Sequence, residues 1–506
     1  MTEDKYKILC ETSDSFLQHP ETSIPGLAIP WLHILNEHPS NLIKYQDSFL
    51  LSLRRQFGSI KSALRTMIDF LTTRRSPLGW ELSHDLESHI DVLMVSHLLN
   101  KMHIGVKNDF YFGSLPEELS RCGLSLLVVL HNHTGTKSLK IRGHWPEDQP
   151  PRLLFDQVLS FKDEWDLRRK LKQQSKRLRA LSKETQTEEE RNVLEMASFE
   201  ALSTDSIVSL RFYLQLCRLV ERYKPKVIVV TYEGHAWERL AFAASRTAVK
   251  KVLCVGYQHA ILFPKQHAIM RTLRYDCNPD IIWTSGDITR NALAEVVDSK
   301  TTRIETVGTP KFSQPNTDLI QKFTADGKIC CLVIPDGTVS ECLLIINFVL
   351  ASAKLAPNVD FLIRMHPVIE FSYLVKLNPQ LKNLPSNVIL SNNSLQIDIS
   401  NSRWALYRGS SVVIQSIVAG LRPFYVSTNT ELCIDPIYAL KSWRKHTSCP
   451  ADFTRMIEND LKADEVNLVE EWSHARDFCL KYFCEFNVTK IIETIGGRDG
   501  IGLANS

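Results

Sequence analysis

Apolar runs alternate with amphipathic stretches through the middle of the chain. The run KPKVIVVTYEG at 224–234 is followed by WERLAFAASRTA at 237–248 and then by KKVLCVGYQHA at 250–260. Short continuous apolar runs are typical of strands covered on both faces, and apolar residues at helical spacing between them indicate crossover helices. The same alternation continues through 279–296 and 302–310. The pattern therefore predicts parallel βαβ units.

A second series of the same kind begins at residue 328. It follows the polar, proline-containing stretch 311–327, which predicts a linker. The apolar runs of this second series are KICCLVIP, VDFLIRMHP, NVILSNNS, RWALYRGSS and RPFYVS. We therefore expect two doubly wound α/β domains at 105–310 and 328–449, followed by C-terminal helices at 450–506.

The beginning of the chain has a weaker pattern. Helical spacing at 48–75 and 89–102 predicts a helix-rich region, 1–104, that forms part of the N-terminal half. The densely charged segment 160–195 predicts a solvated helix or a connector inserted in the N-terminal domain. The alternative is that its basic part, 168–183, rests on anionic lipid and makes a peripheral membrane contact.

Composition restricts the classes of function. The chain has 506 residues, which favours two or more domains, and its net charge of +3 does not demand a nucleic-acid partner. No apolar run in the sequence is long enough to span a bilayer, and the mixed-charge start differs from a signal peptide. The 12 cysteines lack zinc-site spacing. We expect a cytoplasmic protein with reduced thiols, at most peripheral at the inner face of the membrane.

Polar residues end the apolar runs of the second series. Ligands of doubly wound sheets bind outside the carboxyl ends of the strands, so these residues are candidate site residues. They include Asp336 and Gly337 after one run, and Arg364 and His366 after the next. Gly337 allows the backbone to approach a ligand, and Pro367 holds the histidine rigidly. The alternative for the histidine is a satisfied side chain at an ordinary strand end.

The RGSS turn at 408–411 is the clearest of these strand ends. Gly409 permits a tight turn, and Ser410 or Ser411 can cap the helix that follows. Free N–H groups and the helix dipole then form a phosphate site, to which Arg408 adds positive charge. The alternative is an ordinary helix cap. Two anion-binding loops in one domain favour a bound nucleotide.

Strand ends of the first series offer groups that accept protons or bind sugars. Glu233 and His259 can take a proton from an acceptor hydroxyl, and Gln258 can bind a sugar. His133 of the HNH stretch is predicted to line the substrate site; no third ligand nearby in sequence supports a metal. Glu341, in the helix after the PDG turn, is positioned to reach a ribose hydroxyl or to act as a cap.

The order of these motifs resembles bacterial glycosyltransferases of the GT-B fold. It is most similar to the HP-motif sialyltransferases and the Kdo transferases. The general character of the sequence also resembles a broad group of bacterial surface-carbohydrate biosynthesis proteins. The matching stretches, within about residues 105–430, are DFYFGSLPEEL, VVTYEGHAWE, GYQHA, PDGTVSECL, FLIRMHP and YRGSSVVIQSIVAGLRP. The resemblance implies an α/β architecture of two Rossmann-type doubly wound domains that face a cleft, with helical N-terminal additions.

The resemblance also implies roles for individual residues. His366, Ser410 and Ser411 would hold the phosphate of a CMP-sugar, and Glu233 would be the general base. No essential metal and no other cofactor would be needed, because loop donors take the place of the metal. Tyr232 stands where those families have a second acidic residue, and this departure weakens the assignment of the base.

These features together predict a nucleotide-sugar-dependent glycosyltransferase of surface polysaccharide biosynthesis, with Glu233, His259 and His366 as catalytic residues. The predicted reaction is inverting transfer of a CMP-activated sialic or nonulosonic acid, or a Kdo-type sugar, to a glycan or lipid-linked glycan acceptor. One alternative is a nucleotide-sugar 2-epimerase or a CDP-linked polyol-phosphate transferase of the same fold; the latter would use histidines in both halves. Another is a non-catalytic scaffold of polysaccharide assembly, which would not need so many polar strand ends.

Overall fold

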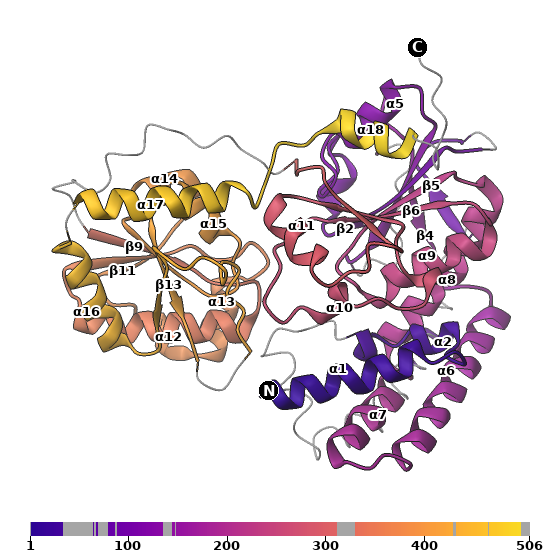
Figure 1. The fold of residues 1–506 in the computed structure, drawn as a ribbon, viewed down its shortest axis with the longest axis horizontal. Coiled ribbons are helices and arrows are strands. Elements are labelled where there is room, and N and C mark those ends of the chain that lie inside the picture. The colour runs from indigo at the N-terminus through magenta and orange to yellow at the C-terminus, as the bar shows by residue number, and fades with distance from the viewer. Residues whose placement is uncertain are drawn as a thin grey trace.

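The structure is a computed structural model in which two α/β domains lie side by side (Figure 1). It describes residues 2–33, 79–86, 89–134, 144–146, 148–310, 329–428, 432–463 and 465–496, with the isolated positions 64, 67 and 68. The predicted linker at 311–327 and nearly all of the helix expected at 48–75 lie outside the described residues.

The N-terminal domain is built on an eight-stranded sheet with the order β1-β4-β3-β2-β5-β6-β7-β8. Its strands are β1 (Trp80–Leu82), β2 (Val92–Leu98), β3 (Leu126–Asn132), β4 (Arg152–Phe155), β5 (Val227–Thr231), β6 (Leu253–Gln258), β7 (Ile281–Thr284) and β8 (Arg303–Thr306). Neighbouring strands are parallel except the antiparallel edge pair β1 and β4. Without the edge strand β1, the order β4-β3-β2-β5-β6-β7-β8 is the doubly wound order of Rossmann-type sheets.

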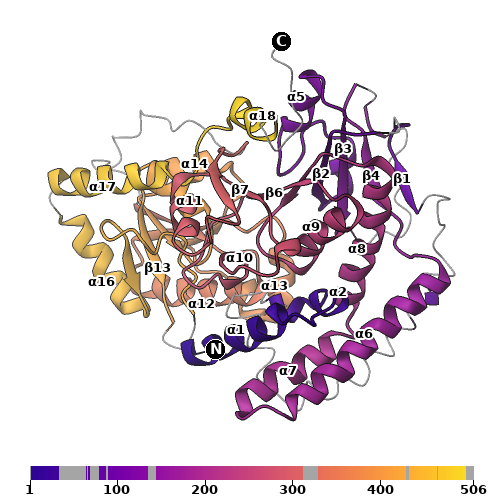
Figure 2. The same cartoon turned by 45° about the vertical axis from the view of Figure 1, so that its right-hand side comes forward.

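Helices cover this sheet and extend beyond it. They are α1 (Glu3–Gln18), α2 (Ile24–Leu27), α5 (Leu115–Arg121), α6 (Phe161–Ser182), α7 (Glu188–Glu200), α8 (Thr204–Tyr223), α9 (Ala236–Ala248), α10 (His267–Met270) and α11 (Asp287–Ala294). The described residues of the same domain also include short 3₁₀ turns at Pro30–His33, Lys101–Ile104 and Tyr275–Cys277. Helices α6 and α7 pack together as an antiparallel pair that also contacts α1 and α8 (Figure 2). The charged segment at 160–195 is therefore helical, with one face buried in the core.

The helix expected at 89–102 is wrong, because this stretch contains the central strand β2. Its residues VLMVSHL are buried at all but one position. A strand in the middle of a parallel sheet is covered on both faces and therefore reads as a continuous apolar run. Over so few residues that run cannot be distinguished from a buried helix by periodicity.

The C-terminal domain repeats the doubly wound plan with six parallel strands in the order β11-β10-β9-β12-β13-β14. The strands are β9 (Ile329–Ile334), β10 (Val359–Ile363), β11 (Val388–Leu390), β12 (Trp404–Tyr407), β13 (Arg422–Val426) and β14 (Lys445–Thr447). The helices are α12 (Val339–Leu355), α13 (Phe371–Leu377), α14 (Leu395–Ser400), α15 (Val412–Val418), α16 (Pro450–Leu461), α17 (Glu465–Leu480) and α18 (Val488–Gly496), with a 3₁₀ turn at Pro379–Lys382. The second alternating series is thus confirmed.

The end of the chain returns to the N-terminal domain. After α17 the backbone bonds to the ends of β7 and β8, where Cys484 N donates to Ser285 O at 2.9 Å and Asn487 N donates to Val307 O at 2.8 Å. Helix α18 then packs beside α5, with Ile491 buried in the N-terminal core (Figure 1). The two domains are therefore joined at their edges by the C-terminal segment.

Loops at the carboxyl ends of the two sheets also meet. Ile261 and Phe263, which follow β6, pack in the core of the C-terminal domain. Leu432, which follows β13, packs in the core of the N-terminal domain. The two doubly wound domains thus approach each other through their carboxyl edges, which is the GT-B-like architecture predicted from the sequence. Within the described residues, no helix combines the length and the hydropathy needed to cross a bilayer.

Candidate active site at two sheet edges

The first part of the candidate site lies at the switch point of the N-terminal sheet, between β2 and β5. The strand order runs away from this pair in both directions, and in such sheets ligands bind at the carboxyl ends there. His97 lies at the end of β2, and its Nε2 is 2.8 Å from Oγ1 of Thr231 at the end of β5. The other ring nitrogen, Nδ1, is 2.7 Å from Nε2 of His133. A hydrogen-bonded chain thus runs from Thr231 through His97 to the exposed His133.

Aromatic rings surround these histidines. His131 stacks on Trp237 with ring centroids 4.9 Å apart and an interplanar angle of 11°. Tyr111, in the loop after β2, lies with its ring 5.0 Å from His97 and 4.3 Å from His259. The rings partly shield His97 and His131 from water and hold them in fixed orientations, while His133 stays exposed.

This packing keeps the imidazoles neutral. Burial, together with the neighbouring histidines, lowers the pKa of His97 to about 2 and that of His131 to about 3. Burial also lowers the pKa of His133. A neutral imidazole has one nitrogen that can accept a proton, whereas the imidazolium has none. His97 and His131 are therefore neutral hydrogen-bond partners at neutral pH, but pKa values of about 2 and 3 make them weak bases that would not hold a proton there.

The TYEG turn supplies two carboxyl groups. Glu233 Oε2 lies 3.1 Å from His235 Nε2. Glu238 is buried, and its Oε2 accepts the backbone N–H groups of Glu233 and His235 at 2.8 Å, which caps α9. Burial raises the pKa of Glu238 to about 7. Tyr232 is buried in the core, so Glu233 is the partly exposed acid of this turn.

Gln258 and His259 end β6 next to this cluster. The side-chain amide of Gln258 donates to Ala260 O, while its Oε1 is buried without a hydrogen-bond partner among the described residues. An unsatisfied buried acceptor of this kind is suited to a ligand donor. His259 contacts the Tyr111 ring. The structure thus brings the predicted residues Glu233, Gln258 and His259 to one sheet edge with His133.

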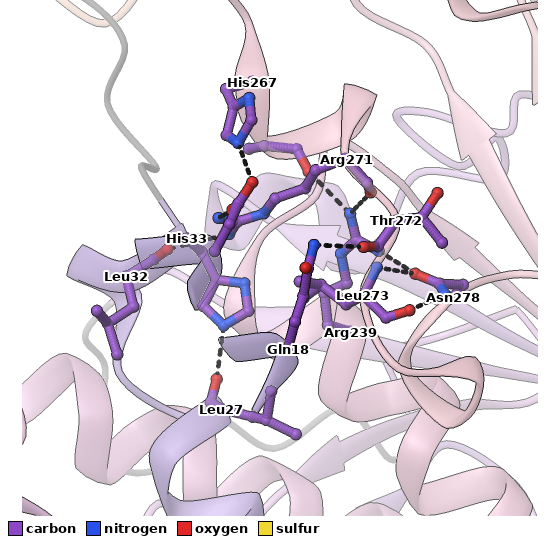
Figure 3. Close-up of polar contacts among 12 residues, drawn as sticks. Gln18, Leu27, Leu32, His33, Arg239, His267, Arg271, Thr272, Leu273 and Asn278 are labelled. Atoms are coloured by element: carbon purple, nitrogen blue, oxygen red, sulfur yellow. Dashed lines mark hydrogen bonds and ion pairs between the residues drawn. The ribbon is translucent and has the colours of Figure 1, made fainter. Parts of the chain in front are cut away.

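The loop after β6 is held from behind by the N-terminal helix α1. Asp14 on α1 pairs with Arg271 and His267 at 2.8 Å each. Arg239 donates to Asn278 Oδ1 at 2.5 Å and to backbone carbonyls of the same loop (Figure 3). Burial alone would raise the pKa of Asp14, but its bond with His267 and the charge of Arg271 hold the pKa below its ordinary value. Helix α1 therefore fixes the loop that follows His259.

The second part of the candidate site lies at the switch point of the C-terminal sheet, between β9 and β12. Gly409 has φ of +60°, and a Cβ there would lie 2.5 Å from Oδ2 of Asp336. A Cβ on Gly337 would lie 3.1 Å from the His366 ring. The turns after β9, β10 and β12 therefore touch one another. Burial lowers the pKa of His366, although the nearby Asp336 carboxylate opposes this.

The arginines at this edge are bound to carboxylates inside the domain. Arg408 is 1% exposed, pairs with Glu341 and donates to Val426 O at 2.7 Å. Arg364 donates from Nη1 to the buried Asp398 at 2.9 Å. Direct contacts of Arg408 with phosphate and of Glu341 with ribose stay predictions, and they would require this pair to open. Its observed effect is to fix β12 against α12.

The two serines of the RGSS turn differ in exposure. Ser410 is 8% exposed, whereas Ser411 is exposed at the N-terminus of α15 and makes no side-chain cap bond. Of the two hydroxyls, that of Ser411 is therefore the one available to a ligand.

Several residues of the site were missed in the sequence. They are His97, Tyr111, His235 and Trp237. The sequence pattern does not mark His97 because it predicts a helix where β2 lies. His131 belongs to the HNH stretch, whose two histidines are candidates from the sequence, and His235 follows Glu233 in the EGH stretch, where this spacing is the available signal. Among the described residues, no group of three or more His, Cys, Asp or Glu side chains is arranged to hold a metal ion.

No family model matches the chain, and no curated protein matches it. Solved structures that resemble it include the glycotransferase of kitacinnamycin, with 13% identity, 82% of this chain and 100% of that chain covered, and a TM-score of 0.44. The S. aureus MnaA–UDP co-structure has 11% identity, 80% and 96% coverage and a TM-score of 0.45. Acinetobacter baumannii MurG has 10% identity, 80% and 99% coverage and a TM-score of 0.44. Similarity at this level does not establish a shared activity, and the resemblance to sialyltransferases and Kdo transferases stays a prediction.

Proposed function

We propose that this chain is a glycosyltransferase that uses a nucleotide sugar. One observation carries the proposal: two doubly wound sheets approach each other through their carboxyl edges, and each switch point holds a different kind of polar group. Neutral imidazoles and carboxyl groups gather at one edge, and glycine- and serine-containing turns gather at the other. A transferase of this kind needs both, since it must remove a proton from an acceptor and stabilise a departing phosphate.

The donor nucleotide would bind at the C-terminal edge. Ser411 and the backbone of the Gly409 turn offer hydrogen-bond donors to its phosphate, and His366 offers one more when its imidazole N–H faces the ligand. The Asp336 carboxylate repels phosphate and instead suits a ribose hydroxyl or an amino group of the base. Negative charge grows on the phosphate as the glycosidic bond breaks, which is where these donors lower the barrier.

The acceptor would bind at the N-terminal edge. As its hydroxyl oxygen forms a bond to the anomeric carbon, its proton passes to a base, and the electron pair of the breaking C–O bond goes to the nucleotide phosphate. Glu233 and His259 are proposed for this base. His133 is a third candidate, because its bond to His97 connects it to a second imidazole. Gln258 would hold a sugar hydroxyl through its unsatisfied Oε1.

The narrower proposal is inverting transfer of a CMP-activated sialic or nonulosonic acid, or a Kdo-type sugar, to a glycan or lipid-linked glycan of a surface polysaccharide, without an essential metal. The HP and SS motifs support it through their resemblance to those transferases. A second candidate is transfer of a CDP-linked polyol phosphate. It is favoured by the presence of histidines at both edges, His259 and His366 among them.

Calorimetric titration of the protein with CMP, CDP and UDP tests the proposal. Binding of CMP alone, weakened in Ser411→Ala, is the expected result. Preference for UDP would indicate a hexose transferase or a 2-epimerase, and preference for CDP would indicate the polyol-phosphate reaction. Failure of all three nucleotides to bind would contradict the proposal and favour a scaffold of polysaccharide assembly. Val368→Ala, an exposed change in the loop after His366, serves as the control.

A further inference from the structure

The outward face of helix α6 carries an unusual combination of side chains. Its inner face packs Leu167, Leu171 and Leu178 into the core of the N-terminal domain. Along its outer face runs a stripe of residues at alternating spacings of three and four, which stay in line along a helix. All members of this stripe are exposed: Lys162, Trp165, Arg169, Lys172, Lys176, Arg179 and Lys183. The stripe contains no acidic residue and continues one residue beyond the helix.

An aromatic pair lies at the start of this stripe. Phe161 and Trp165 are each 66% exposed, and their rings stack with centroids 6.4 Å apart at 21°. Large aromatic side chains are ordinarily buried, and exposed ones that cluster mark an interaction surface. Trp is also the side chain that is enriched where a membrane meets water.

Acidic groups neighbour the stripe and are ion-paired, two of them with arginines of α8 and one with Arg169 of the stripe itself. Asp163 pairs with Arg218 at 2.8 Å, Glu164 pairs with Arg211 at 2.6 Å, and Asp166 bonds Arg169 and Lys170. On α7, which packs beside α6, an acidic cluster at 188–190 lies at the end of the helix pair that is distant from Phe161 and Trp165. Lys172 and Lys176 have no ion pair with any described residue, so the centre of the stripe is positively charged.

We propose that the outer face of α6 docks the protein on an anionic lipid surface. The stripe, here called the α6 stripe, consists of Phe161 and the residues of the outer face given above. Its cations run along one side of a straight helix that is about 33 Å long at 1.5 Å per residue, which suits a flat sheet of negative charge. The aromatic pair supplies the interfacial anchor, as in amphipathic helices that lie on membranes. Figure 2 shows α6 and α7 projecting together from the domain, so a plane can approach them.

Two other partners are less well suited to this surface. A duplex nucleic acid presents curved grooves, and a straight row of lysines contacts its phosphates over a short length. An acidic protein would satisfy the lysines but gives no reason for the stacked pair Phe161 and Trp165. Lipid accounts for both observations, and the inference does not depend on the proposed glycosyl transfer.

Vesicle sedimentation tests the proposal with the full-length chain. The protein should sediment with vesicles of phosphatidylcholine and phosphatidylglycerol and stay in solution with phosphatidylcholine alone, and added salt should release it. The double variant Lys172→Glu, Lys176→Glu should lower the partition coefficient at least tenfold. The matched control is Lys376→Glu, Lys382→Glu, which makes the same change of charge at exposed lysines of the other domain.

A second pair of variants tests the aromatic anchor. Trp165→Ala should weaken vesicle binding several-fold and leave its salt dependence in place, whereas Tyr373→Ala, exposed on α13, should have no effect. Circular dichroism verifies that each variant is folded. Equal sedimentation of the α6 and control double variants would overturn the proposal. Binding of a duplex oligonucleotide, but not of vesicles, that is lost in the same α6 variant would also overturn it.

Discussion

The two sheets share one strand order, but their switch points hold different side chains. At the N-terminal edge, His97, His131 and His133 lie against one another and their pKa values are lowered, so they are neutral. At the C-terminal edge, the arginines are ion-paired with carboxylates inside the domain, Arg408 with Glu341 and Arg364 with Asp398. The part of the C-terminal edge that faces solvent therefore consists of turns.

The difference would separate two tasks that the proposed glycosyl transfer requires. The proposed base candidates Glu233 and His259 lie at the N-terminal edge, beside neutral imidazoles that can hydrogen-bond an acceptor, so this edge suits removal of a proton from the acceptor. Internal ion pairs fix the strand ends, so the C-terminal turns are rigid and suit the orientation of a ligand. Variants at the N-terminal edge should therefore change turnover. Variants at the C-terminal edge should lower nucleotide affinity, or abolish both nucleotide binding and turnover.

The largest effect is expected at His366, which belongs to the C-terminal edge but would face the reacting phosphate. His366→Ala should lower turnover by roughly 10²- to 10⁴-fold, because a donor to the departing phosphate is lost. Turnover is measured with the donor that calorimetry identifies, and circular dichroism monitors the fold. Val368→Ala should behave as wild type. Unchanged turnover in His366→Ala would remove His366 from the site.

The next effect concerns the internal charges of the C-terminal edge. Glu341→Ala leaves the buried Arg408 without its carboxylate, and breaking a buried pair in this way typically costs about 3–5 kcal/mol in the free energy of unfolding. Urea denaturation followed by circular dichroism measures the change. Glu370→Ala, at an exposed position of the same domain, should change stability by less than about 0.5 kcal/mol. Similar midpoints for the two variants would show that the pair does not hold this edge.

Most of the fold could be predicted from the sequence. The strands of the C-terminal domain are short apolar runs that end in polar turns, and β9, β10 and β12 follow that pattern closely. Strand β2 could not be distinguished from a helix, because a strand buried on both faces has no alternation.

The site was harder to predict because contacts between distant residues define it. The sequence identified Glu233, His259 and His366 as polar groups at strand ends. It did not show that the guanidinium of Arg408 turns inward to Glu341, since both residues also fit a ligand-binding role. It also did not show that His97 and His133, on neighbouring strands, share a hydrogen bond. Side-chain direction at a strand end depends on the packing around it, which local pattern does not encode.

The N-terminal edge should show a pH-dependent stability through Glu238. Burial raises the pKa of this carboxyl from its ordinary value of 4.5 to about 7. The stability contributed by the neutral carboxyl is therefore fully present below pH 4.5 and is lost as the pH rises through about 7. The change should be at most about 3 to 4 kcal/mol, since the pKa rises by about 2.5 and one pKa unit corresponds to about 1.36 kcal/mol.

Glu238→Gln tests this, because glutamine keeps an acceptor for the backbone N–H groups of α9 and cannot ionise. Relative to this variant, the wild type should lose stability between pH 5 and pH 8 in urea denaturation. The exposed Glu189→Gln on α7 should run parallel to the wild type. If the stability of Glu238→Gln also runs parallel to that of the wild type, Glu238 is ionised in the folded protein throughout the range from pH 5 to pH 8.

The smallest effect is the most specific test of the separation between the two edges. His97→Ala removes the link between Thr231 and His133 and should lower kcat about 10- to 100-fold, because His133 would no longer be held in a fixed orientation at this edge. Calorimetric affinity for the nucleotide should stay unchanged, because the nucleotide would bind at the other sheet. Thr231→Val removes only the inner end of the hydrogen-bonded chain and should have a smaller effect on kcat.

If His97→Ala instead weakened nucleotide binding and left kcat intact, the histidines would bind the donor. The assignment of proton transfer to the N-terminal edge would then have to be reversed.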